Sequence, residues 1–534
     1  MENNKKETLE RLFIWLTLIT VAVLLFSSIY HIAFVIDDDF DHYLYAQRRK
    51  IYLSALAGAS EQGRISNLFL SYMACLPFSA NSLLVYKLIS YGSIIFAVWT
   101  MYFLLSRHVD RKMGIIAAIL FFGLAQVDAQ HNLFIAYVFS HQMSIGFVLL
   151  SAERQITYYK KHNKWCMVAS GALLMLSAIF YEAFFMFCVM SFVISMFASF
   201  INEKKSLIKR IGSSLWELRF HIIFVALYLV VYLIFRMNSD ISYDGNSFGS
   251  FNLLEIGYAI LNYAFGLVPF ENFRSYVKNE GFAQYIIYVK PAYVIVAIMA
   301  AVAVYLLVRK VKKLNRNQYI GLFMISIMVI LFSTVIVGST GKYREWAIAY
   351  DVRAYVPSYY SYFGIIMLIV TVAILCYQKI SNRIVHAVVM TLISACVLLG
   401  CITSSTSNNK FKMDYANGNL AKQITFDSVV SSDYFLEQVP NEATVYIEGE
   451  ISLQGSPSNL NHITAVYTEK SYNFVDTKAE VDFAERTYGL YYDPVTLTAR
   501  FGILNQDYTL KNEKVYEQFS NGKMSHFVGH AQAQ

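Results

Sequence analysis

The segment DDDFDHYLY, residues 37–45, places four carboxylates and a histidine within six positions, directly after an apolar run that begins near Leu12. A carboxylate can take a proton from an attacking hydroxyl, and neighbouring carboxylates supply the hard oxygen ligands that a divalent cation prefers. Asp38 and Asp39 are therefore the candidate catalytic residues and, if a metal is bound, its candidate ligands. Asp37 is a candidate binding residue. The same carboxylates could instead only mark where a helix leaves the membrane.

Two shorter stretches add a cation and a further carboxylate. In EQGRISNLFL, Gly63 permits a tight turn, and Arg64 offers a planar guanidinium that suits a phosphate. In LSAIFYEAFFMF, Glu182 stands between two apolar runs, where a carboxylate is costly and by default marks a function. The alternatives are a surface turn at Arg64 and an ordinary turn between helices at Glu182.

Two later loops carry further candidate binding residues. DAQHNLFIAYVFSHQ places Asp128 and His131 between two apolar runs. GSTGKYREWAIAYDVRAYVPSYYSYFG mixes cations with many aromatic residues, and its candidates are Lys342, Arg344, Arg353 and Tyr355. Cations there could hold a phosphate, and aromatic faces could stack on sugar rings or lie in an interfacial belt. Either loop could also be an ordinary polar connection.

The elements that position these residues are membrane helices. Of 534 residues, 56% are hydrophobic and 15% are charged, and the mean hydropathy is +0.43. Apolar stretches of about 18 to 25 residues, enough for a hydrocarbon core of about 30 Å, recur from Leu12 to about Ile402. Because a barrel would show short alternating segments instead, the composition predicts an all-α polytopic membrane protein.

The positive charges indicate topology. The net charge is +7, but Lys and Arg recur in short clusters between apolar runs, as in cytoplasmic loops, and are not pooled in one patch for nucleic acid. With the N-terminus inside and the first span uncleaved, about eleven spans put every cluster inside. The predicted spans are 12–36, 83–105, 113–130, 134–151, 165–181, 183–201, 219–236, 285–308, 318–338, 358–377 and 384–403.

This topology places three long segments outside: 37–82, 237–284 and 339–357. The first two have helical spacing with polar breaks, typical of interfacial helices, and we expect them to roof a cavity. After residue 403 the chain shows strand-like runs, namely ATVYIEGEIS, NHITAVYTEK and YDPVTLTARFGIL. We predict a membrane domain over 1–403 and a small extracytoplasmic domain, rich in β-strands, over 404–534. The six cysteines indicate neither a disulfide framework nor a zinc site.

The unit formed by the first helix, DDDFDHYLY, an interfacial helix and the Gly-Arg pair resembles the start of GT-C superfamily membrane glycosyltransferases. It looks most like the bacterial O-antigen serotype-converting glucosyltransferase type. The Tyr-Glu at 181–182 and the Arg-x-Tyr-x-Pro stretch at 353–357 resemble that family as well. The resemblance implies a catalytic carboxylate at Asp38 or Asp39, or at Asp37 in another register. It matches Arg64 to the family's Gly-Arg and makes Asp128 a candidate second acid.

The resemblance further implies a polyprenyl-phosphate sugar donor and inverting transfer to a cell-surface glycan or other acceptor at the outer face of the cytoplasmic membrane. We expect Asp38 or Asp39 to act as general base, with Arg64, Arg353 or Lys342 holding the charge of the leaving polyprenyl phosphate. The expected partners are donor, acceptor and membrane lipid, without nucleic acid. No cofactor is required, and a divalent cation is possible.

Two other functions remain open from the sequence. A polymerase or ligase of lipid-linked oligosaccharides is also multi-spanning, but it more often relies on arginines in large outer loops. A transporter or flippase should carry its sites near the bilayer midplane on broken helices. Here the polar residues gather at the predicted outer face. The sugar, the acceptor and the oligomeric state are not specified by the sequence.

Overall fold

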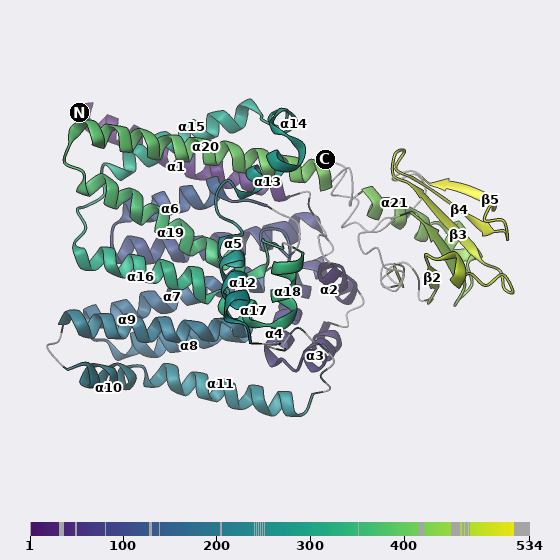
Figure 1. Cartoon of the computed structure of the whole chain (residues 1–534), viewed down its shortest axis with the longest axis horizontal. Coiled ribbons are helices and arrows are strands. Elements are labelled where there is room, and N and C mark those ends of the chain that lie inside the picture. Colours follow the sequence, from purple (N-terminus) through teal and green to yellow (C-terminus); the bar gives the residue numbers. More distant parts are fainter. Residues whose placement is uncertain are drawn as a thin grey trace.

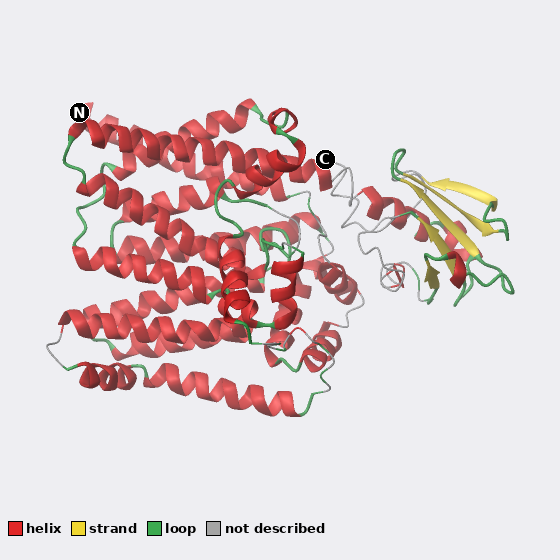
Figure 2. Cartoon of the chain, viewed as in Figure 1, coloured by secondary structure: helices red, strands yellow, loops and turns green. Residues whose placement is uncertain are grey.

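The computed structural model is helical up to residue 415 and ends in a small sheet (Figures 1 and 2). It describes residues 2–516 except 31, 33–36, 48–50, 81, 128–130, 138, 203–205, 240, 242, 244, 246, 248, 250, 351, 416–420, 450–459, 462, 463, 465–467 and 469. The α-helices of the first part are α1 Glu2–Ile29, α2 Asp37–Gln47, α3 Ile51–Gln62, α4 Ile65–Cys75, α5 Leu83–His108, α6 Arg111–Leu124, α7 Ser140–Lys161, α8 Lys164–Phe180, α9 Phe187–Asn202, α10 Leu207–Glu217, α11 Arg219–Met237, α12 Leu253–Phe265, α13 Glu271–Glu280, α14 Phe282–Ile286, α15 Pro291–Val308, α16 Arg316–Phe332, α17 Val335–Ser339, α18 Gly341–Ala349, α19 Val356–Lys379 and α20 Arg383–Tyr415. Two short 3-10 helices, η1 Leu76–Ala80 and η2 Glu182–Met186, join them.

Seven helical spans among the described residues are long and apolar enough to cross a membrane: α1, α5, η2 with α9, α11, α15, α19 and α20. Helices α8 and α16 are shorter apolar helices. The chain is therefore a multi-pass membrane protein, which confirms the predicted fold class. Each of the eleven predicted spans overlaps at least one helix, although the ends differ and three spans each overlap a second, short helix. The first span is predicted to reach residue 36, whereas α1 ends at Ile29.

The basic connections gather at one end of the helical part. Lys310 donates to Glu10 Oε1 at 2.5 Å, which brings the α15–α16 connection beside α1. The Lys312 amide donates to Asp110 Oδ2 at 3.0 Å and so joins that connection to the one between α5 and α6. Glu153, in the second half of α7, forms an ion pair with Arg107 of α5 at 3.1 Å. Figure 1 shows the N-terminus at this same end, on the left.

Side-chain caps begin several helices at this basic end. Asp110 accepts from the Lys112 amide at 2.7 Å, and Asn163 accepts from the Trp165 amide at 3.0 Å. Asn315 forms a reciprocal capping box with Gln318 at the start of α16. Each cap satisfies one of the backbone N–H groups that a helix start leaves without an internal partner. The polar residues between the apolar runs therefore fix where the spans begin.

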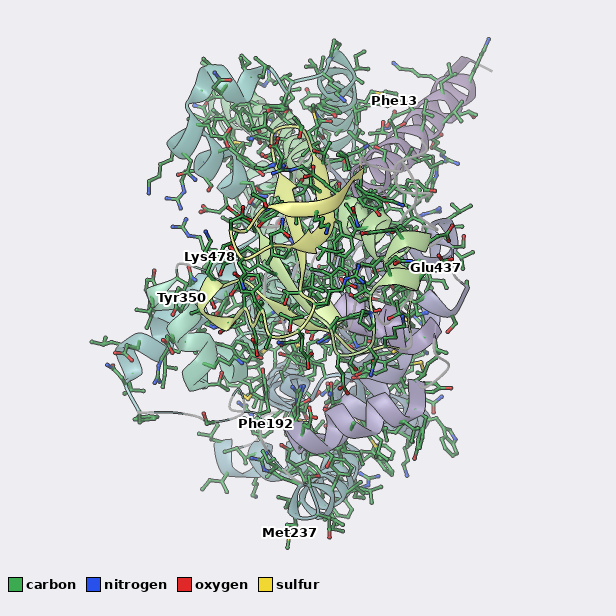
Figure 3. The ribbon with its side chains drawn as sticks, turned by 90° about the vertical axis from the view of Figure 1, so that its right-hand side faces the viewer. Phe13, Phe192, Met237, Tyr350, Glu437 and Lys478 are labelled. Atoms are coloured by element: carbon green, nitrogen blue, oxygen red, sulfur yellow. The ribbon has the colours of Figure 1, made fainter. Side chains whose placement is uncertain are left out.

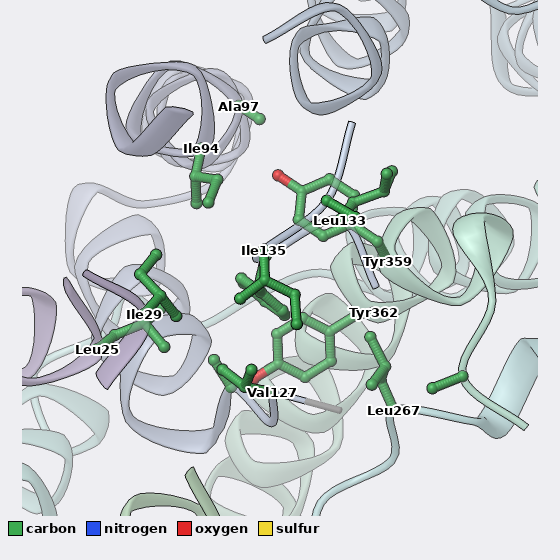
Figure 4. Packing of buried hydrophobic residues seen from close by; sticks show 14 of the residues in the cluster. Leu25, Ile29, Ile94, Ala97, Val127, Leu133, Ile135, Leu267, Tyr359 and Tyr362 are labelled. Carbon is green, nitrogen blue, oxygen red and sulfur yellow. The ribbon is translucent and has the colours of Figure 1, made fainter. Parts of the chain in front are cut away.

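The core surrounds α6, whose residues 113–124 are all buried, and the non-helical segment that follows it (Figure 4). The sequence predicts helix over 113–130 and 134–151, but α6 ends at Leu124 and α7 begins at Ser140. The chain can leave the helical conformation between α6 and α7 because side-chain amides form hydrogen bonds with its buried backbone groups. Asn408 accepts from the Val127 amide at 2.7 Å, and Gln142 donates to the carbonyls of Leu133 and Ala136 at 2.8 and 3.0 Å.

The predicted external segments fold mainly into short helices. Residues 37–82 form α2, α3, α4 and η1, residues 237–284 contain α12 and α13, and residues 339–357 contain α18. Figure 1 shows α2, α3 and α18 at the end of the helical part away from the N-terminus. Gly63 makes the tight turn between α3 and α4 with φ +60°, a left-handed conformation that suits glycine.

The C-terminal part holds one five-stranded sheet with strand order β2-β1-β3-β4-β5. Its elements are α21 Ala421–Val430, α22 Asp433–Gln438, β1 Thr444–Glu448, β2 Asn473–Val475, η5 Lys478–Glu480, β3 Tyr488–Asp493, β4 Thr498–Leu504 and β5 Leu510–Tyr516. Strand β1 runs parallel to β2 and β3, whereas β3, β4 and β5 are antiparallel in turn. In the view of Figure 3, which looks at the molecule from the right-hand side of Figure 1, the sheet lies in front of the helical part, with Glu437 and Lys478 at its sides.

Two predictions for the C-terminal part differ from the structure. The run NHITAVYTEK was expected to be extended, yet Asn461 and Thr464 are helical. Helix α20 also continues past the predicted boundary at 403 and ends at Tyr415. The other two strand-like runs fall on β1 and on β3 with β4. The short strand β2 and the polar edge strand β5 carry too little apolar alternation to be seen in the sequence.

Candidate active site

A pocket of about 880 Å³, its open mouth included, lies at the end of the helical part that carries α2, α4 and α18. All three predicted external segments contribute to its wall. The lining residues are Asp38, His42, Gln62, Arg64, Asn67, Leu70, Ser71, Tyr137, His141, Tyr181, Glu182, Ala183, Tyr243, Gly245, Ile336, Val337, Thr340, Tyr343, Tyr355 and Val356. Carboxylates, one arginine and several tyrosines make the wall mainly polar, with a few aliphatic side chains beside them, a composition suited to the polar head group of a lipid.

The two candidate catalytic carboxylates, on adjacent positions of α2, lie in different surroundings. Asp38 is exposed and lines the pocket, whereas Asp39 is completely buried. Asp39 Oδ1 accepts from the Tyr137 amide at 3.0 Å, and its Oδ2 has no hydrogen-bond partner among the described residues. Burial, with the charge of Asp38 adding, raises the pKa of Asp39 to about 8, although the Tyr137 amide and Lys87 favour the ionised form. Asp38 is thus the carboxylate that a substrate can reach.

Tyr137 bridges both carboxylates from the segment between α6 and α7. Its amide binds Asp39, and its hydroxyl donates to Asp38 Oδ2. Burial and the negative charge of Asp38 raise the pKa of Tyr137 well above its usual value, so the hydroxyl keeps its proton and acts as the donor. One residue therefore fixes the positions of both acidic side chains.

His131 lies behind Tyr137 in an aromatic setting. Its Nδ1 is 2.8 Å from the Tyr137 hydroxyl. The imidazole stacks on the Tyr137 ring with centroids 5.6 Å apart and on the Trp346 ring at 6.0 Å, and it meets the Tyr355 ring edge-on at 5.1 Å. Burial lowers the pKa of His131, although the charge of Asp38 opposes this shift. His131 is therefore held as a neutral ring.

Arg64 and Glu182, 118 positions apart in the sequence, form an ion pair on the pocket wall. Both side chains are largely buried, with 15% and 19% of their surfaces exposed. Ser66 donates to the other carboxylate oxygen of Glu182 at 2.5 Å, and Arg64 also donates to Gln62 at 3.0 Å. The guanidinium lies 6.0 Å from the Tyr181 ring centroid. The sequence singles out both residues, and the structure brings them together.

The outer loop with α18 divides its cations between two settings. Lys342 lies over the rings of Tyr243 and Trp346, 4.7 and 5.8 Å from their centroids, close to the pocket. Arg344 is buried and pairs with Glu255 of α12 at 3.4 Å. Arg353 pairs with Glu271 of α13. Neither Arg344 nor Arg353 lines the pocket, and both instead tie the loop to neighbouring helices.

The predicted site residues thus fall into distinct groups. Asp38, Arg64, Glu182 and Tyr355 line the pocket, and His131 reaches it through Tyr137. Asp128 lies outside the described residues, and so does the side chain of Asp37.

Several residues of the site are not predicted by the sequence analysis. Tyr137, Tyr243 and Tyr343 line the pocket, and the last two share a hydrogen bond of 2.6 Å between their hydroxyls. His42 and His141 also line it, and Nδ1 of His141 is 2.7 Å from the Tyr360 hydroxyl. One sequence signal could have pointed to Tyr137. The amide side chains at 126, 132 and 142 mark a break in an apolar run, and Tyr137 lies in that break.

The arrangement of the acidic side chains does not fit a cation shared by Asp38 and Asp39, because only Asp38 faces the pocket. Among the described residues, no three His, Cys, Asp or Glu side chains converge so that they could hold a metal ion.

Comparison with solved structures finds distant likenesses. The chain is similar to ArnT from Cupriavidus metallidurans in the apo state, at 13% identity and TM-score 0.38, over 91% of this chain and 93% of that one. It is similar to the same protein bound to undecaprenyl phosphate at 12% identity and TM-score 0.40, over 95% and 98%. It is also similar to the Archaeoglobus fulgidus oligosaccharyltransferase tethered with an acceptor peptide, at 12% and 0.39, over 86% of this chain and 64% of that one. No protein-family model and no curated protein matches the chain. With every TM-score below 0.5, none of these likenesses decides what this chain does.

Proposed function

We propose that this chain is a membrane glycosyltransferase of the GT-C type. It transfers a sugar from a polyprenyl-phosphate donor to a hydroxyl of a cell-surface glycan or other acceptor at the outer face of the cytoplasmic membrane. The observation that carries the proposal is the accessible carboxylate of Asp38 in a pocket that also holds Arg64 and a set of tyrosines. A bacterial envelope glycan, such as an O-antigen, is the acceptor class that the sequence resemblance favours.

In the proposed reaction, Asp38 is the general base. The acceptor oxygen forms a bond to the anomeric carbon while the bond from that carbon to the phosphate oxygen breaks. The acceptor proton passes to Asp38, and polyprenyl phosphate leaves with the bonding electrons. Arg64, with Lys342 at the pocket edge, supplies positive charge for that leaving group. Tyr355 and the neighbouring tyrosines offer faces on which a sugar ring can stack.

The ends of the helical part support the proposed orientation. Basic connections gather at the end that holds the N-terminus, as expected for a cytoplasmic face. The pocket lies at the other end, so a lipid-linked donor would react at the outer face. The N-terminus would be cytoplasmic and the C-terminal sheet extracytoplasmic.

The test is incubation of the purified, detergent-solubilised protein with a panel of polyprenyl-phosphate sugars and acceptor candidates, with release of polyprenyl phosphate as the measurement. We expect release by the native chain and a loss of at least a hundredfold in Asp38→Asn, within the range for removing a general base. Asp39→Asn is the matched neighbour, and we expect it to keep much more activity. Retained activity in folded Asp38→Asn would reject the assignment of the base. No release from any donor would favour a polymerase, a ligase or a transporter.

A further inference from the structure

The hydrogen bonds at Asp38 form a directed chain. Oδ2 of the ionised carboxylate can only accept, so the Tyr137 hydroxyl must donate its one proton to it. The bond of 2.8 Å between this hydroxyl and His131 then requires Nδ1 to be the donor. The direction therefore runs from the His131 imidazole through the Tyr137 hydroxyl to Oδ2 of Asp38, and Oδ1 is the carboxylate oxygen that takes no part in this series of bonds.

The backbone of this segment is held in an unfavourable conformation. His131, Tyr137 and Phe139 have φ values of +57°, +49° and +86°, which non-glycine residues rarely adopt. Such conformations cost free energy and persist only where the surroundings over-determine them. Here they allow one residue, Tyr137, to meet Asp39 with its amide and Asp38 with its hydroxyl.

His131, where this series of hydrogen bonds begins, also contacts the outer loop. The His131 ring stacks with the rings of Tyr137 and Trp346, and the Tyr355 ring contacts it edge-on. Trp346 belongs to α18, and Tyr355 directly precedes α19. The orientation of the imidazole, and with it the donor that faces Tyr137, is therefore set by residues far from Asp38 in the sequence.

We propose that His131 and Tyr137 form a positioning relay that fixes the rotamer of Asp38 and directs its other carboxylate oxygen, Oδ1, into the pocket. This inference rests on the proposed function, because it assigns the relay to the general base of that reaction. His131 is thereby given a role through Tyr137 and Asp38, in place of direct contact with substrate.

The kinetic test is a set of single and combined variants of the full chain. Tyr137→Phe keeps the ring but removes the hydroxyl, and we expect kcat to fall about tenfold to a hundredfold while the donor KM changes less than about twofold. His131→Phe keeps the stacked ring but cannot donate, and we expect a smaller fall, about threefold to tenfold. Because both act through one hydroxyl, the double variant should be no slower than Tyr137→Phe.

The matched control is Tyr359→Phe, also a buried tyrosine, whose hydroxyl has no hydrogen-bond partner among the described residues. We expect this variant to keep the native kcat. Multiplying losses in the double variant, or a change confined to KM, would overturn the relay.

A second readout does not depend on turnover. The rate at which a water-soluble carbodiimide modifies Asp38, followed by mass spectrometry, should rise at least about threefold in Tyr137→Phe, because Oδ2 is released. A rise there but not in Tyr359→Phe supports the positioning even if no donor is turned over, in which case only the proposed function fails. Equal modification rates in the native chain and Tyr137→Phe would overturn the relay, whatever the activity.

Discussion

At the residue scale, the sequence shows three adjacent aspartates but does not show which of them faces the pocket. Successive helical residues are about 100° apart, so in α2 Asp38 turns toward the pocket and Asp39 into the protein. This choice depends on what packs against α2, chiefly Tyr137, which lies 98 positions beyond Asp39. Arg64 and Glu182 were each predicted as site residues, but their pairing is a tertiary contact that neither local stretch encodes.

The buried carboxyl of Asp39 predicts a pH dependence of stability. Its pKa is raised from 3.8 to about 8, so between these values the folded chain binds more protons than the unfolded chain. By linkage, this group's contribution to the free energy of unfolding falls as pH rises from about 4 to about 8. We expect Asp39→Asn, which stays neutral, to show a flatter melting temperature than the native protein across that range. Asp38→Asn is the control and should keep the native slope; an unchanged slope in Asp39→Asn would contradict the prediction.

At the scale of elements, hydropathy located the spans but not the break after α6. The segment 125–139 has apolar residues on both sides of a polar centre, and amides from distant elements satisfy buried backbone groups of Ala125 and Val127. Asn408 of α20 accepts from the Val127 amide and donates to the Ala125 carbonyl at 3.0 Å. Asn272 adds a bond to the Val127 carbonyl at 2.9 Å. Only the assembled fold shows that these side chains meet, which explains why the span 113–130 was predicted to end too late and the span 134–151 to begin too early.

This arrangement predicts that Asn408 is important for stability. Asn408→Leu keeps the approximate volume but leaves a buried N–H and a buried carbonyl without this partner, at about 1–3 kcal/mol each. We expect a clear fall in melting temperature in detergent. The control is Asn409→Leu on the same helix, because among the described residues the Asn409 amide donates only a long contact of 3.7 Å to Met413 Sδ, and its fall should be smaller. Equal falls in the two variants would show that the amide network is not what holds this segment.

At the scale of the whole molecule, the most predictable property was the arrangement of spans, because apolar length and charge clusters act over the entire chain. The three predicted external segments also converge on one pocket, as expected. The tyrosines that complete that pocket could not be singled out among 40 in the chain, since an aromatic residue near a membrane surface has many possible roles.

The predicted orientation can be measured with two exposed lysines at opposite ends. In a variant without its native cysteines, Lys278→Cys on α13 should react with a membrane-impermeant maleimide in intact cells. Lys313→Cys, in the connection between α15 and α16, should react only after the membrane is opened. The reverse pattern would show that the N-terminus is outside and would move the pocket to the cytoplasmic face.

The length of α20 indicates how deep the pocket lies relative to the bilayer. Its 33 residues span about 50 Å at 1.5 Å each, about 20 Å more than the hydrocarbon core. The surplus is the polar stretch from Ser404 onward, most of which is buried against protein. Asn408 in this stretch bonds to Val127, so with the apolar part of α20 in the hydrocarbon core the linker that carries Tyr137 would lie level with the head groups of the bilayer. A lipid head group could meet Asp38 at that height while its tail stays in the bilayer.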